Sequence, residues 1–284
     1  MLCVMRLVGH DSIVATLDYD TADAARRLVA EGRAAELVGL TVDKSTLGAA
    51  AELACAAQIW ERDGDAAAMA ALQRWADGAP ALARAIACVR GAGRSEIGRH
   101  AAPEAELEPV GTNPDEITFM CERFKRSLVD HGGYAKPLAT GVSGALGEMT
   151  DNVLRHSTDE EGTPAPAVVG YAVSGAEFEF VVADVGRGAL ASLRSIAAWR
   201  ELKDAYAALD AIVTRGATRR SAQTVGGGFR DLFTALVDLA GELRLRTDDA
   251  AITLDGRGDF ARRIKVHAAV PSLSGFQVTV RGRR

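Results

Sequence analysis

The sequence predicts an α/β protein of the α+β kind, with a mainly helical N-terminal region, and three observations lead to this prediction. Residues 113–116, Asn-Pro-Asp-Glu, mark a helix start because they supply an N-cap, a first-turn proline and a capping-box glutamate. Residues 167–173 and 177–183 predict two strands joined by a Ser-Gly turn. A long helical insert and three further extended stretches follow, at 242–246, 264–270 and 277–280. This order favours a mixed sheet that is covered by helices on one face.

Helical periodicity divides the chain into two regions. The helix from residue 113 has one apolar face and ends at Gly132 or Gly133, and a second helix is expected over about 140–156. We therefore expect a mainly helical N-terminal domain over 1–92, a linker over 93–111 and a second domain over 112–284. In the first domain the alanine-rich sequence predicts helices at 20–33, 45–62, 65–76 and 80–89, and short strands at 12–17 and 36–42 would make it α/β.

Composition argues against several classes of protein. Apolar residues make up 48% of the 284 residues and charged residues 25%, as in ordinary globular domains. The formal net charge of -5 argues against a nucleic-acid or membrane-surface partner, since both favour a basic patch. Cys3, Cys55, Cys88 and Cys121 form neither a CxxC pair nor a zinc-type cluster. No segment has the form of a signal peptide or membrane span, so we expect a cytoplasmic protein with reduced thiols.

The first candidate site lies near the end of the second helix, where residues 148–157 read Glu-Met-Thr-Asp-Asn-Val-Leu-Arg-His-Ser. Glu148, Asn152 and His156 are four residues apart, and each step drifts by only about 40°, so the three project from one helix face. Such a face can hold a hydrated Mg²⁺ and polarise a water molecule beside a triphosphate. For this box taken alone, a solvated polar face is the alternative.

The second candidate site follows the strand at 177–183. Residues 181–188, Val-Val-Ala-Asp-Val-Gly-Arg-Gly, run from the strand into an Asp-x-Gly-x-Gly pattern. The carboxylate of Asp184 can accept a hydrogen bond from the exocyclic amine of a base, and Gly186 and Gly188 let the backbone approach a ligand closely. By itself the pattern is equally typical of a glycine-rich turn after a strand.

The third candidate site is the glycine run Gly226, Gly227 and Gly228, which precedes an apolar helix over 233–240. A glycine run at a helix start exposes backbone N–H groups at the positive end of the helix dipole, and this arrangement suits a phosphate. A flexible hinge is the alternative.

The three candidate sites are short sequence boxes, and in their order and context they resemble the GHKL superfamily. This superfamily comprises gyrase, the heat-shock chaperone ATPases, histidine kinases, MutL and the anti-sigma serine kinases. The resemblance covers residues 112–284. It implies a Bergerat fold, an α/β sandwich of two layers, with ATP bound between the helical layer and a mobile lid over 189–225. By position, Asn152 would bind Mg²⁺ and Glu148 would be the general base. Asp184 would accept a hydrogen bond from the adenine amine beside Gly186 and Gly188. Gly226, Gly227 and Gly228 would bind the phosphates.

Two residues depart from the family pattern. Many members have glycine where this chain has Arg230, so phosphate contact there would be looser or supplemented by the guanidinium group. Many members also place threonine after the glycine of the last strand, where it binds adenine through water. Here Phe276 follows Gly275, which puts that contact in doubt.

The resemblance leaves three functions open. Histidine kinase is the reading to reject, because neither His10 nor His100 lies on a dimerisation seam before the domain. The acid at Glu148 suits either ATP hydrolysis or transfer to a serine hydroxyl. We rank an Mg-dependent ATPase acting as a conformational switch first and an anti-sigma-type serine/threonine kinase second, with a non-hydrolysing ATP-binding module third. A protein partner is expected through the N-terminal domain or a homodimer.

Overall fold

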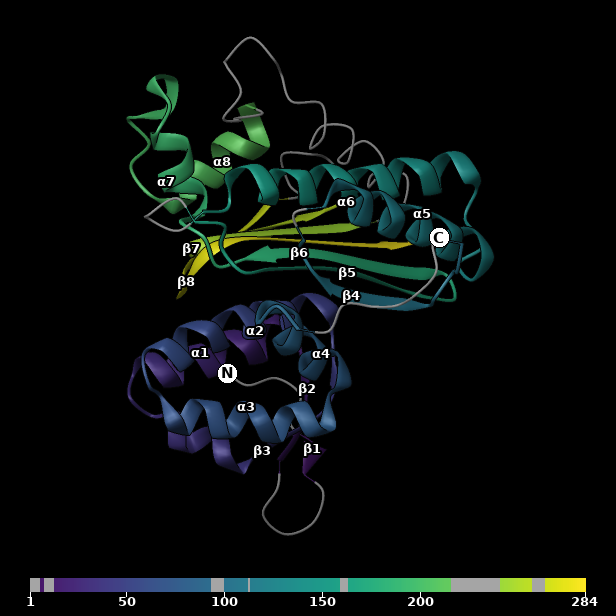
Figure 1. Ribbon diagram of the computed structural model, residues 1–284. Helices are drawn as coiled ribbons and strands as arrows, with labels where there is room; N and C mark the ends of the chain where they lie inside the picture. The colour runs from purple at the N-terminus through teal and green to yellow at the C-terminus, as the bar shows by residue number, and fades with distance from the viewer. Residues whose placement is uncertain are drawn as a thin grey trace.

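The computed structural model describes residues 6–7, 13–92, 100–111, 113–158, 163–215, 241–256 and 264–284. These residues form stacked layers, with a five-stranded sheet in the middle (Figure 1). Two long helices cover one face of this sheet, and the N-terminal half of the chain covers the other. The protein is thus of the α+β class that the sequence predicts.

The N-terminal half contains its own three-stranded sheet, in the order β1–β2–β3, with β2 parallel to β3 and antiparallel to β1. It is therefore an α/β unit. The strand expected over 36–42 begins later, because residues before it form a 3₁₀ turn that an ion pair between Arg33 and Glu36 supports. In chain order the elements are β1 (Arg6–Leu7), β2 (Ile13–Leu17), α1 (Tyr19–Ala30), η1 (Ala34–Gly39), β3 (Leu40–Ser45), α2 (Leu47–Arg62), α3 (Ala66–Gly78) and α4 (Pro80–Val89).

The large sheet has the strand order β4–β5–β6–β8–β7. All of its described pairings are antiparallel, so the expectation of a mixed sheet was wrong. The predicted hairpin is present, and its turn contains Gly175 with a left-handed φ of 54°. Strand β8 covers both of the stretches that were predicted as separate strands at 264–270 and 277–280. The strands of the large sheet are β4 (Ala105–Pro109), β5 (Ala167–Ser174), β6 (Glu177–Asp184), β7 (Glu242–Asp255) and β8 (Ile264–Arg283).

Helices α5 (Pro114–Asp130) and α6 (Lys136–His156) pack side by side on one face of this sheet (Figure 1). Helix α5 starts where the sequence predicts, since the side chain of Asn113 accepts a hydrogen bond from the amide of Asp115. The ring of Phe124 in α5 stacks on Tyr171 of β5, with 4.6 Å between centroids. Three short helices lie near one end of this layer, namely α7 (Gly188–Arg194), η2 (Ala197–Trp199) and α8 (Ala205–Arg215).

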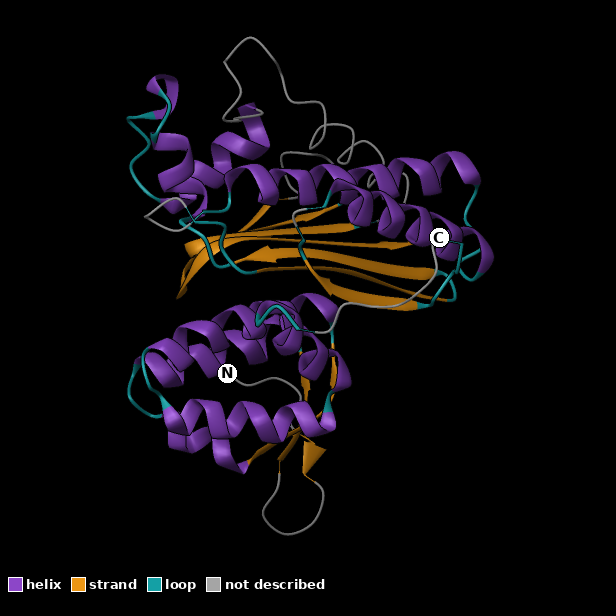
Figure 2. Ribbon diagram, in the orientation of Figure 1, coloured by secondary structure: helices purple, strands orange, loops and turns teal. Residues whose placement is uncertain are grey.

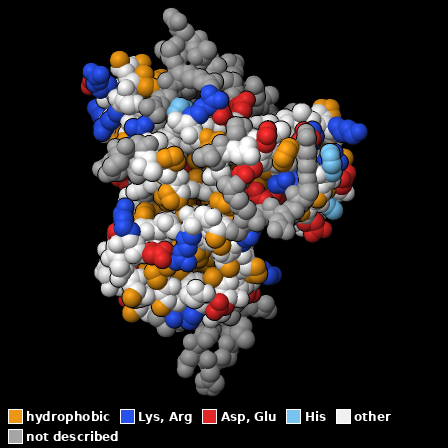
Figure 3. All heavy atoms as spheres, viewed as in Figure 1, with side chains coloured by type: hydrophobic (Ala, Val, Ile, Leu, Met, Phe, Trp, Pro, Cys, Tyr) orange, Lys and Arg blue, Asp and Glu red, His pale blue; other side chains and the backbone are white. Residues whose placement is uncertain are grey.

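The reverse face of the large sheet packs against α2 (Figure 2), so the expectation of helices on one face only was wrong. Every residue of α2 from Leu47 to Ala57 is buried, and six of them are alanines whose small side chains let the helix sit close between layers. One apolar cluster joins the helices of the N-terminal half to Val181 and Ala183 of β6. The space-filling view shows hydrophobic side chains where the two halves meet (Figure 3).

The range 93–111, which we expected to be a linker, contains β4. This strand pairs with β5 along its whole length, and its residue Glu106 is buried against Arg123 of α5. The sheet of the second half therefore begins before residue 112. Composition misled the prediction because a short edge strand with alternating glutamates looks like a polar connection. Among the described helices, none is both long and apolar enough to cross a bilayer.

Candidate functional site

The first and second candidate boxes meet at one end of the large sheet. Asp184 is the last residue of β6, and Ser157 is the C-cap residue of α6. The amide of Arg187 donates a hydrogen bond to the carbonyl oxygen of Thr158 at 3.0 Å. Gly186 lies against the hydroxyl group of Ser157, because an added Cβ would stand 2.6 Å from its Oγ. Two motifs that are separate in the sequence are thus in direct contact.

The side chain of Asp184 is directed toward the helical layer. Phe178, Phe180 and Val182 of β6 belong to the core beneath α5 and α6, and Asp184 continues their alternation. Only 3% of Asp184 is exposed, and its Oδ1 accepts a hydrogen bond from the amide of Gly186 at 2.8 Å. A buried carboxylate therefore ends this strand on the face where the family resemblance implies a nucleotide.

The protonation of Asp184 is set mainly by its burial. Burial raises the pKa of this carboxyl group to about 6, and the nearby Ser157 hydroxyl together with the backbone amides of Gly186 and Phe276 offsets part of that rise. A carboxylate offers about four lone-pair positions, so these donors leave room for another. At neutral pH the group is mostly ionised.

Both glycines of the Asp-x-Gly-x-Gly pattern have structural reasons to be glycine. Gly186 has no room for a Cβ beside Ser157 and Asp184. Gly188 has a left-handed φ of 77°, and an added Cβ would stand 2.8 Å from the Thr247 hydroxyl. Their packing explains the pattern without a ligand, so their predicted place beside an adenine ring stays a prediction.

The outer face of α6 carries the other two predicted residues. Glu148 and Asn152 are exposed, whereas Met149 and Val153 on the opposite side are buried in the core. Neither predicted side chain forms a hydrogen bond with another described residue, so both are available to a ligand. The structure thus brings the end of this helix to Asp184 while leaving Glu148 and Asn152 on a solvent-facing surface.

Two residues near Asp184 were missed by the sequence analysis. The Thr247 hydroxyl of β7 donates to the carbonyl oxygen of Gly275 at 2.8 Å and accepts from the amide of Ala189 at 2.9 Å. The side-chain amide of Gln277 in β8 donates to the backbone carbonyl oxygen of Asp184 at 3.0 Å. Thr247 and Gln277 come close to Asp184 only because of the register between strands, and no local sequence motif encodes that register.

The predicted phosphate-binding residues Gly226, Gly227 and Gly228, together with Arg230, lie outside the described residues. The predicted lid over 189–225 is described only as far as residue 215. In that part α8 is anchored by six buried apolar residues that belong to the main core. The buried residues of α8 are Ala205, Ala208, Leu209, Ala211, Ile212 and Val213.

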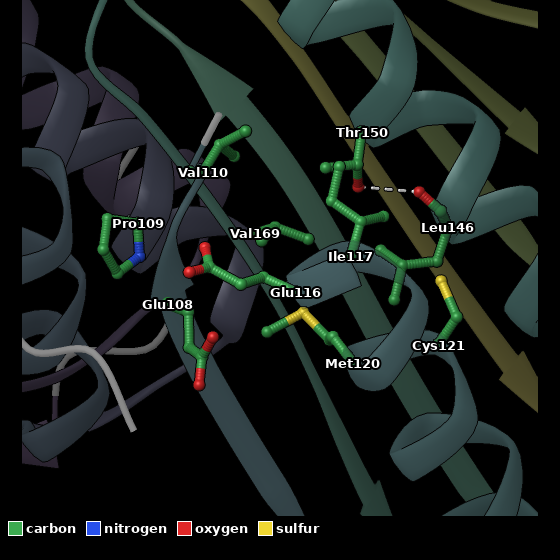
Figure 4. A pocket seen from close by; sticks show the side chains of 11 residues that line it. Glu108, Pro109, Val110, Glu116, Ile117, Met120, Cys121, Leu146, Thr150 and Val169 are labelled. Atoms are coloured by element: carbon green, nitrogen blue, oxygen red, sulfur yellow. Dashed lines mark hydrogen bonds between the residues drawn. The ribbon is translucent and has the colours of Figure 1, made fainter. Parts of the chain in front are cut away.

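A small cavity lies away from this site, between β4, α5 and α6 (Figure 4). Thr150, from the first box, lines it and donates its hydroxyl hydrogen bond to the carbonyl oxygen of Leu146 at 2.8 Å. The enclosed space suits about one water molecule, so it is far too small for a nucleotide. Thr150 therefore serves the packing of α6 and not the ligand-facing surface.

The described residues offer a metal ion one predicted ligand, Asn152. Among the described residues, no three His, Cys, Asp or Glu side chains are grouped so that they could hold a metal ion. Asn152 offers one exposed amide oxygen, and Mg²⁺ commonly takes few protein ligands together with phosphate oxygens and water. Asn152 would therefore hold Mg²⁺ only together with a ligand that supplies further oxygen atoms.

The chain matches no protein-family model, and no curated protein matches it.

Proposed function

We propose that this chain binds Mg-ATP at the end of β6, with the adenine amine on Asp184. One contrast carries the proposal: among the described residues, three buried carboxylates lie within or against the large sheet, and two of them pair with arginine. Glu106 pairs with Arg123, and Glu52 pairs with Arg244 at 2.9 Å. No lysine or arginine among the described residues pairs with Asp184. An external N–H donor, such as a base amine, would supply the missing partner.

In this proposal Asn152 holds Mg²⁺ and Glu148 serves as the general base, as the GHKL resemblance implies. Magnesium would neutralise charge on the phosphates when the ion is bound. The exposed carboxylate of Glu148 would orient a water molecule or a hydroxyl group for attack on the terminal phosphate. The two residues are four positions apart along α6, so the metal-binding and base roles would fall on one helix face.

ATP hydrolysis that drives a conformational switch is the first candidate activity. It is supported by the extensive packing of the N-terminal half on the reverse face of the sheet, since a switch needs an element that responds to the nucleotide. Serine/threonine protein phosphorylation is the second candidate. It is supported by the exposure of Glu148, which a hydroxyl group of another protein could reach. A cytoplasmic location and a protein partner or homodimer belong to the same proposal.

Calorimetry with Asp184→Asn tests the adenine assignment. We expect this variant to bind Mg-ATP more weakly by about 1–3 kcal/mol, the loss expected for a charged hydrogen-bond partner. Glu106→Gln is the matched control, because it also removes a buried carboxylate from the same sheet but lies on the edge strand β4. Unchanged ATP affinity in a folded Asp184→Asn protein contradicts the proposal.

Two further variants test the separate roles of Asn152 in metal binding and Glu148 as the general base. Asn152→Ala should lose the Mg²⁺-dependent part of ATP binding, whereas Glu148→Gln should bind ATP normally and lose turnover. Asp151→Asn is the control, since Asp151 is on the same helix but pairs with Arg155 at 2.7 Å. If Asn152→Ala and Glu148→Gln lose equal amounts of nucleotide affinity, the helix face is structural.

Incubation with labelled ATP separates the candidate activities. Steady phosphate release by the purified protein supports the switch ATPase. Transfer of label to one discrete protein in a cell lysate, with no phosphate release in its absence, favours the kinase. Binding of ATP without either reaction indicates a non-hydrolysing module.

A further inference from the structure

The N-terminus of α2 docks on the large sheet through a single carboxylate. Glu179 of β6 accepts hydrogen bonds from the amides of Leu47 and Gly48, both at 2.9 Å. The same carboxylate pairs with Arg281 of β8 at 3.1 Å. Free amides at a helix start favour an anion, so Glu179 fixes the position of α2 over β6 and β8.

A second polar contact joins the N-terminal half to β7. Glu52 of α2 pairs with Arg244 at 2.9 Å, and Asp23 of α1 pairs with Arg246 at 2.9 Å. Arg26 of α1 pairs with both of these carboxylates. All three arginines are buried, so each depends on the two acids of the N-terminal half for its neutralisation.

This contact is incompletely neutralised. Three guanidinium groups share two carboxylates, and burial together with the charge of Arg26 lowers the pKa of Arg246 to about 10. The Nε and Nη1 atoms of Arg26 and the Nε atom of Arg246 are buried without a hydrogen-bond partner among the described residues. Buried ion pairs with unmet polar groups contribute little net stability, so this polar contact adds little to the strength of the docking.

The strand β7 links this contact to the candidate site. Arg244 and Arg246 point toward the N-terminal half, while the next residue, Thr247, bonds Gly275 on the opposite side. Gly275 has a φ of 96° and sits so close to the carbonyl oxygen of Asp184 that an added Cβ would collide with it. A short series of contacts through Thr247 and Gly275 therefore connects the arginine pairs to Asp184.

Gln277 makes a second link, from the reverse face of the sheet. It is 1% exposed, and its amide group holds the carbonyl oxygens of Asp184 and Ser274, at 3.0 and 3.2 Å. Two residues further along β8, Thr279 contacts the start of α2, where a Cβ added to Gly48 would stand 2.5 Å from its Oγ1. Displacement of α2 would therefore disturb the strand that holds Asp184.

We propose that the docked N-terminal half positions Asp184 through β7 and β8, so that the affinity for nucleotide depends on the docking of α1 and α2. This inference rests on the proposed nucleotide site and adds its regulation. Binding energies are reciprocal, so nucleotide binding tightens the docking by the same factor by which docking improves nucleotide affinity. Asp23, Glu52 and Gln277 are then positioning residues, because they act on Asp184 only through β7 and β8.

Two interface variants and two controls test this proposal. Glu52→Gln removes the charge that neutralises Arg244, and Gly48→Ala places a methyl group against Tyr19 and Thr279. The controls cause similar damage elsewhere. Gly78→Ala forces a methyl group against the carbonyl oxygen of Val42 inside the N-terminal half, and Glu106→Gln breaks a buried ion pair inside the second half.

Two readouts are measured on the full chain, namely the dissociation constant for Mg-ATP and hydrogen exchange of the Gly186 amide, which bonds Asp184. We expect both interface variants to weaken ATP binding by about threefold to tenfold and to speed exchange at Gly186. The controls should change neither readout. If Glu52→Gln does not fold, the comparison of Gly48→Ala with Gly78→Ala decides.

The two readouts together either support or refute the positioning role of the docked N-terminal half. Interface variants that match the controls in both readouts overturn the proposal. If the unmodified protein binds no ATP, the proposed function fails, and exchange at Gly186 then decides alone. Faster exchange only in the interface variants supports the positioning role, and equal exchange in all four variants refutes it.

Discussion

Replacing Asp184 with asparagine is expected to raise the stability of the ligand-free protein at neutral pH while weakening nucleotide binding. The carboxyl group is buried, and burial raises its pKa from 3.8 to about 6. Ionisation is therefore less favourable in the folded chain than in the unfolded chain. A neutral side chain of the same shape escapes this cost.

The magnitude follows from the pKa shift and linkage. One pKa unit corresponds to about 1.36 kcal/mol, so the shift at Asp184 costs the folded state about 3 kcal/mol once the pH exceeds 6. Between pH 3.8 and about 6 the folded state binds more protons at Asp184 than the unfolded state does. The free energy of unfolding therefore falls as the pH rises through that window. Below pH 3.8 the carboxyl group is neutral in both states and the cost disappears.

Asparagine also loses part of the hydrogen bonding around the carboxylate. The amides of Gly186 and Phe276 both donate to Asp184, and only one oxygen remains to accept them after the substitution. Loss of one such bond costs about 1 kcal/mol, so we expect Asp184→Asn to be more stable at pH 7.5 by about 1–2 kcal/mol. Near pH 4 it should be equally stable or slightly less stable.

Urea denaturation of both proteins at pH 4 and at pH 7.5 measures this prediction. The difference in the free energy of unfolding between variant and unmodified protein should move in favour of the variant by about 2–3 kcal/mol across that interval. A difference that is the same at both pH values refutes the reasoning, because Asp184 would then ionise as it does in the unfolded chain. Glu106→Gln, whose carboxylate is paired with Arg123, is the control and should lose stability at pH 7.5.

Three further substitutions probe the fold and the site. Gly275→Ala should destabilise the protein and abolish ATP binding, because its φ of 96° and its contact with Asp184 both exclude a Cβ; circular dichroism melting and calorimetry check this. Glu52→Gln should lower the free energy of unfolding by about 3–5 kcal/mol above pH 4.5, measured in urea, because Arg244 would stay buried and unpaired. That loss should shrink as the pH falls toward 2, where Glu52, with a pKa of about 2, is itself protonated. Phe124→Ala should cost about 3–5 kcal/mol in the same assay, since its ring is fully buried between α5 and the sheet.

Local sequence signals predicted the second half of the chain well. Asn113 and its following proline located the start of α5, and the alternation before and after Gly175 located the β5–β6 hairpin. These features succeed because capping and hairpin turns are decided by residues within a few positions of each other. The beginning of α6 was less well placed, since the helix starts at Lys136 ahead of the expected Thr140.

Long-range packing could not be predicted in the same way. Helix α2 was correctly expected, but its alanine-rich surface gives no sign that it is covered on several sides. Its role depends on Glu179, which lies more than a hundred residues away and reads locally as the polar position of a half-exposed strand. Register decides whether such a residue meets solvent or another layer, and register is a property of the assembled sheet.

The strand segment around Phe276 supports Asp184 through backbone contacts. The ring of Phe276 is partly buried and packs against the core. Its backbone still donates to Asp184, and Gly275 keeps the close approach that the carboxylate needs. The side-chain amide of Gln277 donates a hydrogen bond to the backbone carbonyl oxygen of Asp184 from the opposite face of the sheet. Asp184 is thus held from the side of the sheet that faces the N-terminal half, which is why a change in docking should alter the affinity of the proposed nucleotide site.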